Sequence, residues 1–323
     1  MKSKGCPCHN KMDSIDLKKI KTYSISERAN KVSVEQLARP LKPGETMKEF
    51  LAGLPDFLAA KNLLVVAKAI ADAKRAGKAV IAAMGAHVIK VGLSPVVIDL
   101  MERGILTHLA LNGAASIHDC ELALFGGTSE DVIAGVKTGR FGMVKETGEF
   151  WNEAVNEGAA GDFGLGEALG KALLKNKPEY LDTSLLAAGA RLKIPVTVHV
   201  TIGADIVHMH PTADGAAIGK TTHADFRRLA SSMTKLGAGG VLINIGSAQL
   251  LPMLMEKSVT VARNLGHDVS GFVGVNMDMI QHYRALLWPV QRAKELGGEG
   301  YAITGHHEIM LPLLAAAVLE ELA

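Results

Sequence analysis

From about Lys78 onward, short apolar segments alternate with longer segments of helical spacing. Strands of that length and apolar character are buried on both faces, as in a parallel sheet covered by helices. The pattern therefore predicts an α/β fold, a Rossmann-like doubly wound and mostly parallel sheet with helices on both faces. The predicted strands are Ala79–Met84, Ile105–Leu111, Val196–Val200, Val241–Ile245, Phe272–Val275 and Tyr301–Thr304.

Segments with apolar residues at helical spacing lie between these strands and before the first of them. Met47–Ala76 has this spacing and predicts two helices as an N-terminal helical extension. Trp288-Pro289 lies inside the segment 279–295, where a proline predicts a kink. The other predicted helices are Pro95–Arg103, Ser116–Phe125, Gly148–Glu157, Leu165–Lys175, Thr183–Arg191, His223–Leu236, Ala248–Leu265, Met279–Glu295 and His307–Leu322.

The first 45 residues differ from the rest because they are polar and lack a sustained period. Proline and glycine bound this stretch, in Arg39-Pro40 and Lys42-Pro43-Gly44. We expect residues 1–45 to form a tail or arm. The remainder, 46–323, has no internal repeat and no low-complexity linker, which favours a single α/β domain.

Composition narrows the class of protein. With 48% hydrophobic residues and a net charge of +2, the chain is not intrinsically disordered. The near balance of 35 basic and 33 acidic residues also disfavours a nucleic-acid partner, which needs a clustered basic surplus. Glycine is abundant, with 34 residues, and a doubly wound sheet uses glycine at its strand–helix junctions.

Cysteine usage and the apolar runs indicate a cytoplasmic protein with no membrane partner. Three cysteines make a poor disulfide framework, and no run approaches the roughly 18 apolar residues of a membrane span. No secretory signal is recognised at the start of the chain. Cys6, Cys8 and His9 resemble half of a metal clip, and either metal binding or a flexible thiol-bearing tail fits them. We assign no metal.

Ligands of open parallel sheets bind at the carboxyl ends of the strands, so the turns there carry the candidate residues. After the first strand, Gly85 allows close backbone approach, and His87 and Lys90 follow. Lys90 is a candidate contact for an anion. The turn lacks a G-x-G-x-x-G pattern, and an ordinary tight strand–helix turn explains it equally well.

The second strand ends in the most informative stretch of the chain, Asn112-Gly113-Ala114 followed by Ser, His, Asp and Glu. Ser116 and Asp119 suit a capping box at the start of the following helix. That structural role does not account for His118 or Glu121, which are candidates for catalysis. The third strand is followed by Asp205, His208 and His210, a plausible acid/base or metal group that also fits polar pocket lining.

Three further strand ends complete the predicted rim of the site. Gly246 and Ser247 end the fourth strand, and Asn276 and Asp278 end the fifth. The amide and carboxylate suit hydrogen bonds to a ribose or an amine, and they suit helix caps equally well. His306 and His307 follow the last strand and open the final helix.

The order of these features resembles the deoxyhypusine synthase family over about three quarters of the chain, from Lys78 to the end. The similarity lies in the small-residue turn with following acidic residues, a basic-glycine run, a helix followed by Ile-Pro-Val, and a Pro-Leu-Leu final helix. These are Asn112–Glu121, Lys137–Gly142, Ser184–Ala190 with Ile194–Val196, and Met310–Leu314.

The resemblance implies a Rossmann-like homotetramer that binds NAD between subunits and transfers an aminobutyl group from spermidine. In that family NAD oxidises the amine to an imine, and a lysine captures the butyl group. The family's Trp-Gly-Lys motif corresponds most nearly to Trp288 with Lys294. Several pocket turns differ, among them Gly85-Ala86-His87 in place of Thr-Ser-Asn. The resemblance therefore implies a homospermidine-synthase-like enzyme that acts on a small amine or polyamine and does not modify a protein lysine.

Two hypotheses result, an NAD-dependent aminoalkyl transferase and a non-transferase paralogue. The paralogue would bind a nucleotide or metabolite, or would be a metal-dependent hydrolase using His208, His210, His306 and His307. For the transferase the covalent lysine is Lys294 or Lys90, and Asp119, Glu121, Asp205 and Asp278 hold the cation.

The expected catalytic residues are His118, Glu121, His208 and Lys294. The expected NAD contacts are Gly85, His87, Asn112, Gly113, Ala114, Asp205, Gly246, Ser247, Asn276 and Asp278. The expected substrate contacts are Lys90, Asp119, His210, His306 and His307.

Overall fold

The computed structural model describes residues 14–323, so the Cys6, Cys8 and His9 group lies outside the described residues. The chain divides at Leu37/Ala38 into two units. The described part of the first unit contains three single 3₁₀ turns, Leu17–Lys19 (η1), Ile25–Glu27 (η2) and Val34–Gln36 (η3). The tail predicted for residues 1–45 and the domain predicted for 46–323 stay predictions as functional units.

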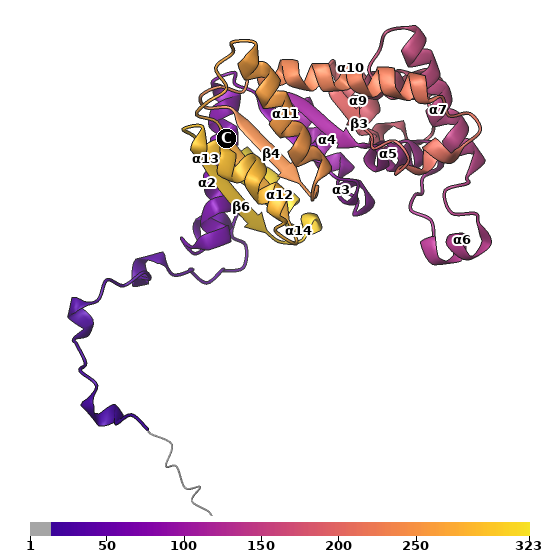
Figure 1. The fold of residues 1–323 in the computed structure, drawn as a ribbon. Coiled ribbons are helices and arrows are strands. Elements are labelled where there is room, and N and C mark those ends of the chain that lie inside the picture. Colours follow the sequence, from indigo (N-terminus) through magenta and orange to yellow (C-terminus); the bar gives the residue numbers. More distant parts are fainter. Residues whose placement is uncertain (1–13) are drawn as a thin grey trace, which may run out of the picture. The chain divides into compact units, whose positions relative to one another are not determined.

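The second unit is built on a six-stranded parallel sheet, which confirms the predicted Rossmann-like doubly wound fold (Figure 1). The strand order is β3-β2-β1-β4-β5-β6, and every strand pair among the described residues is parallel. The strands are Val80–Met84 (β1), His108–Asn112 (β2), Val196–His199 (β3), Val241–Ile245 (β4), Val273–Asp278 (β5) and Glu299–Thr304 (β6).

Helices connect the strands and supply the outer layers. The α-helices are Met47–Ala52 (α1), Leu58–Arg75 (α2), His87–Lys90 (α3), Ser94–Glu102 (α4), Gly113–Phe125 (α5), Val132–Thr138 (α6), Lys145–Ala160 (α7), Leu165–Asn176 (α8), Leu185–Leu192 (α9), Gly215–Met233 (α10), Leu250–Asn264 (α11), Tyr283–Ala285 (α12), Arg292–Glu295 (α13) and His307–Leu322 (α14). Leu181–Thr183 (η4), Ile206–Met209 (η5) and the π-type segment Leu286–Gln291 (η6) complete the set. No helix among the described residues is long and apolar enough to cross a membrane.

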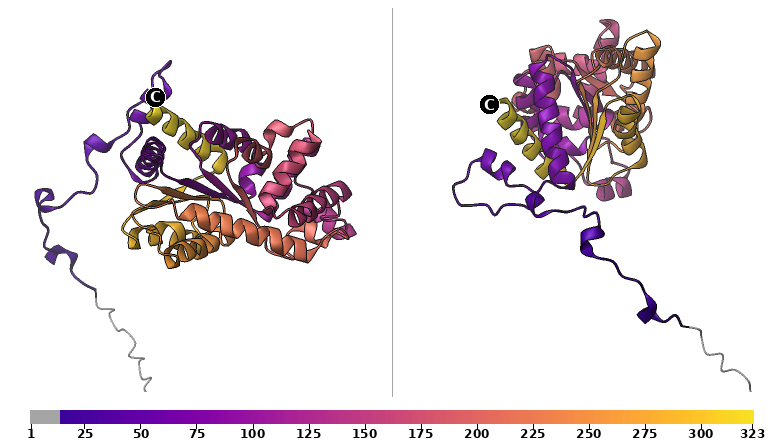
Figure 2. Two further views of the ribbon diagram at one scale, coloured as in Figure 1. Left: turned by 90° about the horizontal axis from the view of Figure 1, so that it is seen from above. Right: turned by 90° about the vertical axis from the view of Figure 1, so that its left-hand side faces the viewer.

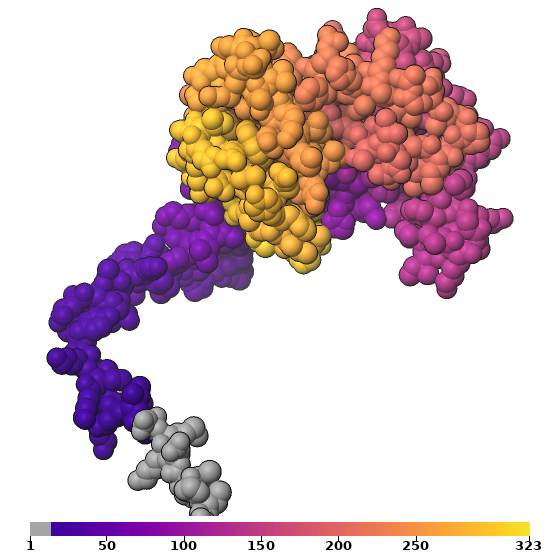
Figure 3. Space-filling model, in the orientation of Figure 1, coloured from indigo at the N-terminus to yellow at the C-terminus, as the bar shows by residue number. Residues whose placement is uncertain are grey.

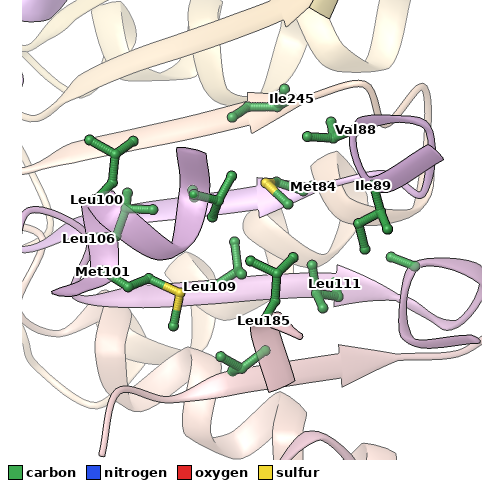
Figure 4. Close-up of a cluster of buried hydrophobic side chains, with 14 of the residues drawn as sticks. Met84, Val88, Ile89, Leu100, Met101, Leu106, Leu109, Leu111, Leu185 and Ile245 are labelled. Carbon is green, nitrogen blue, oxygen red and sulfur yellow. The ribbon is translucent and has the colours of Figure 1, made fainter. Parts of the chain in front are cut away.

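Successive side chains of β1 point to opposite faces of the sheet, and each face has its own hydrophobic core. Val80, Ala82 and Met84 join the larger core with side chains of α2, α4 and α14, while Ile81 and Ala83 join the smaller one with side chains of α10 and α11. Figure 2 shows these helices on opposite faces. Figure 4 shows Met84 of the larger core among neighbouring aliphatic side chains. Because both faces of β1 are buried, its sequence is continuously apolar.

The sheet has a topological switch point between β1 and β4. The chain builds β2 and β3 on one side of β1 and then returns to build β4, β5 and β6 on the other side. The connections leave the carboxyl ends of β1 and β4 in opposite directions, which opens a crevice above them. The turns that follow β1 and β4 are therefore placed where ligands of such sheets bind.

Side chains from α10 protect the exposed edge of β3. Asp225 accepts hydrogen bonds from the backbone N–H groups of Val198 and Gly166, both at 2.8 Å. Thr222 donates to the carbonyl oxygen of Val198 at 3.0 Å. A free edge would present unpaired backbone groups to another chain, and these contacts occupy them.

A buried polar network links β2 and β3, the two strands at one edge of the sheet. His108 bonds to Ser232 at 2.7 Å through Nδ1 and to Thr197 at 2.9 Å through Nε2, and Thr197 reaches Nε2 of His199 at 3.0 Å. Burial lowers the pKa of both histidines to about 3, so both rings are neutral at ordinary pH.

The predicted helices differ from the structure where local pattern is weak. The segment 279–295 is broken, as the proline predicted, because Trp288 adopts an extended conformation (φ −124°, ψ 124°). Helices α3 and α6 were not expected, since four and seven residues are too few to show a period. Helix α10 begins at Gly215, before the predicted His223, because its first turns are glycine and alanine without an apolar stripe.

Candidate functional site

A cavity of about 610 Å³ opens at the carboxyl edge of β1, β2 and β3, and we call it the carboxyl-edge cavity. The turn after each of these strands contributes to its wall, as Lys90 of α3, Ala114 of α5 and Asp205 before η5. The remaining wall comes from α5 itself, the loop 127–130, α6 and the start of α7. Figure 3 shows the segment that carries α6 standing out from the surface of the unit. The volume is typical of a small-molecule site.

The cavity lining combines apolar walls with an excess of carboxylates. Among the described residues, its carboxylates are Glu121, Glu130 and Asp205, and its one lysine is Lys90. Its large apolar side chains are Ile117, Phe125, Val132, Phe141, Val144 and Ile206. A cationic group with apolar flanks would match this lining, because carboxylates attract the charge and the walls accept the apolar part.

Glu121 lies in a network with two threonines. Thr128 donates to Oε2 at 2.5 Å, and Thr147 donates to Oε1 at 2.9 Å. His118 Nδ1 lies 2.6 Å from the Thr128 hydroxyl and 3.8 Å from Glu121 Oε2. Burial opposes ionisation of Glu121, but the neighbouring His118, Thr128 and Thr147 side chains outweigh burial and hold its pKa below its usual value. Glu121 is therefore a carboxylate at neutral pH.

Asp205 packs directly against the turn after β2. A Cβ at Gly113 would lie 2.1 Å from Asp205 Oδ2, so only glycine leaves room for this carboxylate. Oδ2 is buried and has no hydrogen-bond partner within the described chain. Burial raises the pKa of Asp205 to about 6, although the backbone N–H groups of Thr201 and Ala114 oppose the rise. An oxygen in this state gains most from a ligand that brings a donor or a positive charge.

The switch point brings together residues from the turns after β1, β4, β5 and β6. A Cβ at Gly85 would lie 2.1 Å from the carbonyl oxygen of Gly246, so the two turns touch through backbone. His307 is buried beside Gly246, with Nε2 4.0 Å from Asp278 Oδ1 and its ring 5.9 Å from that of His87. Both ring nitrogens lack a hydrogen-bond partner within the described chain. Burial lowers the pKa of His307.

Helix α3 joins the switch point to the carboxyl-edge cavity. Its first residue, His87, faces His307, and its last residue, Lys90, lines the cavity. Three residues of helix rise by about 5 Å, so the two parts of the candidate site are immediate neighbours. The predicted NAD and substrate contacts Gly85, His87, Gly113, Ala114, Asp205, Gly246, Asp278, Lys90 and His307 all lie in one of these two parts.

Four predicted residues at the carboxyl edge make contacts within the protein. Asn112 caps α5 by accepting from the Ala115 N–H at 2.9 Å. Asn276 accepts from Asn244 Nδ2 at 2.7 Å, and Ser247 Oγ accepts from the backbone N–H of Leu251 at 3.3 Å. His210 Nε2 lies 2.8 Å from the Gly142 carbonyl oxygen, which ties η5 to the loop before α7. Their predicted ligand contacts stay predictions.

His208 lies in η5, the same 3₁₀ turn as the cavity-lining Ile206, and only one of its ring nitrogens has a hydrogen-bond partner in the described residues. Its Nδ1 accepts from the Gly203 N–H at 3.2 Å, and its ring meets Trp151 edge to face with centroids 5.8 Å apart. Nε2 is buried without a hydrogen-bond partner within the described chain, and burial lowers the pKa of the ring. His208 is not among the residues lining the carboxyl-edge cavity.

The expected capping box of Ser116 and Asp119 is wrong, because α5 begins three residues earlier with Asn112 as its cap. Ser116 instead donates to the Gly113 carbonyl oxygen and accepts from Trp151 Nε1. Asp119 is fully buried and caps α9, accepting from the Ser184 hydroxyl at 2.6 Å and the Leu185 N–H at 2.8 Å. Its oxygens are occupied by the protein, and the residue does not line the cavity.

Two predicted residues lie apart from the others. Lys294 is in α13, which leads into the start of β6, so it lies at the amino edge of the sheet, opposite the candidate site. His306 occupies the N-cap position of α14, where its side chain makes no capping hydrogen bond within the described residues and is 64% exposed. The structure thus does not bring Lys294 together with His118 or Glu121.

Sequence reasoning missed Thr128, Glu130 and Thr147. Glu130 accepts from the Gly142 N–H at 2.7 Å and lines the cavity together with both threonines. Thr128 and Glu130 belong to a loop without a period, and Thr147 lies in the first turn of α7. The one available signal was the Gly126-Gly127 pair, which marks a turn close to the end of α5.

A second cavity, of about 560 Å³, lies at the amino end of β3 between α8, α9 and α10, and we call it the amino-edge cavity. Lys193 and Lys235 line it and form no ion pair with any residue of 14–323, while Arg228 is paired with Glu167 and Asp225. Within residues 14–323 no group of three or more His, Cys, Asp or Glu is arranged to hold a metal ion. The histidines at 208, 210, 306 and 307 do not form such a group.

Comparison with known proteins gives distant similarity of fold. No protein-family model and no curated protein matches the chain. Solved structures that resemble it include AgrE in complex with ornithine and NAD⁺, with a TM-score of 0.49, 14% identity, 81% of this chain covered and 33% of AgrE. A candidate LOR/SDH protein from Methanococcus maripaludis S2 has a TM-score of 0.49 and 14% identity over 82% of this chain and 71% of its own.

A candidate deoxyhypusine synthase from Entamoeba histolytica also resembles the chain, with a TM-score of 0.49 and 12% identity over 88% of this chain and 96% of its own. This is a distant similarity of fold, without a family match in sequence. The chain spans about a third of the length of AgrE. No substrate, cofactor or residue role is transferred from these proteins at such similarity.

Proposed function

We propose that the protein is an NAD-dependent enzyme that acts on a small amine or polyamine and transfers or releases an aminoalkyl group. The observation that carries the proposal is the lining of the carboxyl-edge cavity, in which Glu121, Glu130 and Asp205 face one lysine among apolar walls. A polyamine alternates ammonium groups with methylene segments, and such a lining accommodates both. The resemblance in sequence motifs to the deoxyhypusine synthases supports the same substrate class.

The switch-point residues fit a dinucleotide. The backbone of Gly85 touches that of Gly246, and the buried ring of His307 offers two nitrogens with no partner within the described chain. Such unmatched polar groups cost free energy unless a ligand supplies the missing hydrogen bonds. Gly85, His87, Gly246 and Asp278 would hold the cofactor at this crevice. NAD bound there would supply a hydride acceptor for oxidation of the amine carbon.

The protein's own residues then bind the amine and move a proton. Asp205 Oδ2 and Glu121 attract the ammonium group into the cavity, and the apolar walls exclude water from its carbon chain. His118 accepts a proton from the amine, because only the neutral amine has a lone pair to assist loss of hydride. Lys90 is exposed, lines the cavity, and replaces Lys294 as the candidate for capturing the aminoalkyl group. Its amine would add to the imine carbon of the oxidised substrate, and the rest of the substrate would leave from that carbon as a free amine.

Assembly into a homotetramer with sites between subunits remains part of the proposal. Helix α6 supports it, because Val132, Ile133 and Val136 are 50%, 71% and 61% exposed beside the cavity. An apolar surface next to a site is typical of a protein interface. Light scattering of the purified protein measures the assembly directly, and a monomer at all concentrations would contradict this part.

The activity is tested with purified protein, NAD and a panel of amines that includes spermidine and putrescine. We expect formation of NADH with one class of amine. Reduction with borohydride during turnover should add the mass of an aminoalkyl group, and Lys90→Met should abolish that adduct. Lys294→Met is the matched control and should keep it. Stoichiometric zinc or iron in a protein that binds no NAD would contradict the proposal.

A further inference from the structure

The hydrogen bonds around Glu121 fix where the protons of its neighbours lie. A carboxylate has no proton to give, so it can only accept hydrogen bonds. Thr128 and Thr147 both reach it, at 2.5 Å and 2.9 Å, and each must therefore donate its hydroxyl proton to Glu121. Each hydroxyl has a single proton, so neither has one left for another partner.

The contact between His118 and Thr128 then has one possible direction. His118 Nδ1 lies 2.6 Å from the Thr128 oxygen, within hydrogen-bond distance. Because the Thr128 proton is already donated to Glu121, Nδ1 must carry the hydrogen and donate it to Thr128. In a neutral imidazole the other nitrogen, Nε2, then keeps the free lone pair. Nε2 has no hydrogen-bond partner among residues 14–323, and His118 lines the carboxyl-edge cavity.

We propose that Thr128 is a positioning residue that holds His118 in the Nδ1–H tautomer, so that Nε2 accepts a proton from the amine in the carboxyl-edge cavity. The proton-accepting role depends on the proposed function, whereas the tautomer is a property of the protein alone. A histidine base oriented by a carboxylate is common in enzymes. Here a threonine hydroxyl lies between the two groups and relays the orientation.

The hydrogen bond from His118 Nδ1 to Thr128 remains in place through a complete proton transfer. When Nε2 takes a proton from the substrate ammonium group, the amine becomes neutral and the ring becomes a cation. The Nδ1–H bond to Thr128 remains, because the cationic ring donates from both nitrogens. The positive ring then lies 3.8 Å from Glu121, whose charge stabilises it. Thr128 therefore orients the base without itself exchanging a proton with substrate.

The test measures the tautomer of His118 by ¹⁵N NMR of histidine-labelled protein, with His118→Asn to identify its signals. We expect the Nδ1–H form in the native protein. Thr128→Val removes the hydroxyl at nearly constant shape and should abolish that preference. Thr128→Ser restores a hydroxyl and should restore it. Thr128→Ala serves the same purpose if the valine variant does not fold.

Thr147→Val is the matched control, because it also removes a hydroxyl bonded to Glu121 and leaves the link to His118 in place. The tautomer should be unchanged in this variant. With the amine substrate, Thr128→Val should lower kcat about 10- to 100-fold with little change in KM, which is typical for loss of a residue that orients a base or ligand. Thr128→Ser should recover most of kcat.

Two results would overturn the inference. One is an Nε2–H tautomer for His118 in the native protein, and the other is an Nδ1–H tautomer that persists in Thr128→Val. The NMR measurement needs no substrate, so the two proposals fail separately. A native protein that shows the Thr128-dependent tautomer but oxidises no amine would contradict the proposed function and support the role of Thr128.

Discussion

The carboxyl-edge and amino-edge cavities are nearly equal in volume, about 610 and 560 Å³, yet their polar groups differ. At the amino edge the carboxylates Glu167 and Asp225 are paired with Arg228, and Asp225 also accepts two backbone hydrogen bonds. At the carboxyl edge Asp205 keeps a buried oxygen without a partner within the described chain. Volume does not distinguish the two cavities, whereas a buried polar atom without a hydrogen-bond partner in the described residues does.

The histidines near each cavity show the same contrast. His108 bonds through both ring nitrogens, to Ser232 and Thr197, and is fully buried. His118 bonds through Nδ1 alone and has Nε2 free of any partner in the described residues. A histidine with both nitrogens matched stabilises the fold, while one with a free nitrogen in a cavity is able to accept a proton. His108 therefore has a structural role, and His118 is the proton acceptor of the proposed function.

The largest expected effect is on catalysis. His118→Asn keeps a donor near Thr128 but removes Nε2, and we expect kcat for amine oxidation to fall by about 10²- to 10⁴-fold, the usual contribution of a general base. The free energy of unfolding should change by about 1 kcal/mol or less, since the side chain is 18% exposed and asparagine keeps a donor for the one hydrogen bond to Thr128. Steady-state kinetics and urea unfolding measure the two. Unchanged kcat would remove His118 from the mechanism.

For His108 we expect the opposite result, a loss of stability with activity retained. His108→Leu leaves the hydroxyls of Thr197 and Ser232 without their partner, and should lower the free energy of unfolding by about 1–3 kcal/mol. Activity per folded molecule should be retained. His267→Leu, at an exposed position, is the control and should have little effect on unfolding. If His108→Leu were stable and inactive, the division between structural and chemical histidines would be wrong.

Alanine substitutions at two glycines test where NAD binds. Gly85→Ala would force a Cβ to 2.1 Å from the Gly246 carbonyl oxygen, and should destabilise the fold by about 1–3 kcal/mol and weaken NAD binding. Gly127→Ala meets nothing within 4 Å and should leave both unchanged. Urea unfolding and equilibrium dialysis with NAD provide the readouts. Full NAD affinity in a folded Gly85→Ala protein would place the cofactor elsewhere.

The smallest expected effect is a pH dependence of amine binding. Burial raises the pKa of Asp205 to about 6, so the carboxyl is neutral below that pH and charged above it. Affinity for the cationic amine should therefore rise as pH increases through about 6. Asp205→Asn should remove this rise, which calorimetric titration at several pH values measures. A rise that persists in the variant would assign it to another group.

The same ionisation has the opposite effect on stability. A carboxyl with a raised pKa binds its proton more tightly in the folded chain than in the unfolded chain. Between pH about 4 and about 6, the Asp205 contribution to stability is therefore lost as pH rises. Comparison of urea unfolding for the native protein and Asp205→Asn across this range checks the sign. Higher pH is thus expected to strengthen amine binding while it removes this contribution to folding.

Local pattern predicted the sheet and much of the candidate site. The strands are short, apolar and flanked by glycine, so their ends, with Gly85, Asn112 and Asp205, could be located from sequence. Parallel strands end at one edge, which placed these residues together. These placements follow from local pattern and strand direction, without side-chain contacts between distant segments.

The features that the sequence did not predict depend on contacts between segments that are distant in the chain. Asp119 was expected to bind a ligand, but it caps α9, which begins 66 residues later in the chain. Thr128 belongs to an irregular loop whose conformation no periodicity encodes. Lys294 was placed by analogy with a motif, and its position at the amino edge follows from the direction of the chain between β5 and β6. Tertiary contacts decided each of these roles.

The most direct test of the account is an experimental structure of the protein with both NAD and spermidine bound. We expect the dinucleotide along Gly85, Gly246 and His307, and an ammonium group of the polyamine about 3 Å from Asp205 Oδ2. His118 Nε2 should face the amine. Binding of spermidine and NAD in the amino-edge cavity, beside Lys193 and Lys235, would contradict the account.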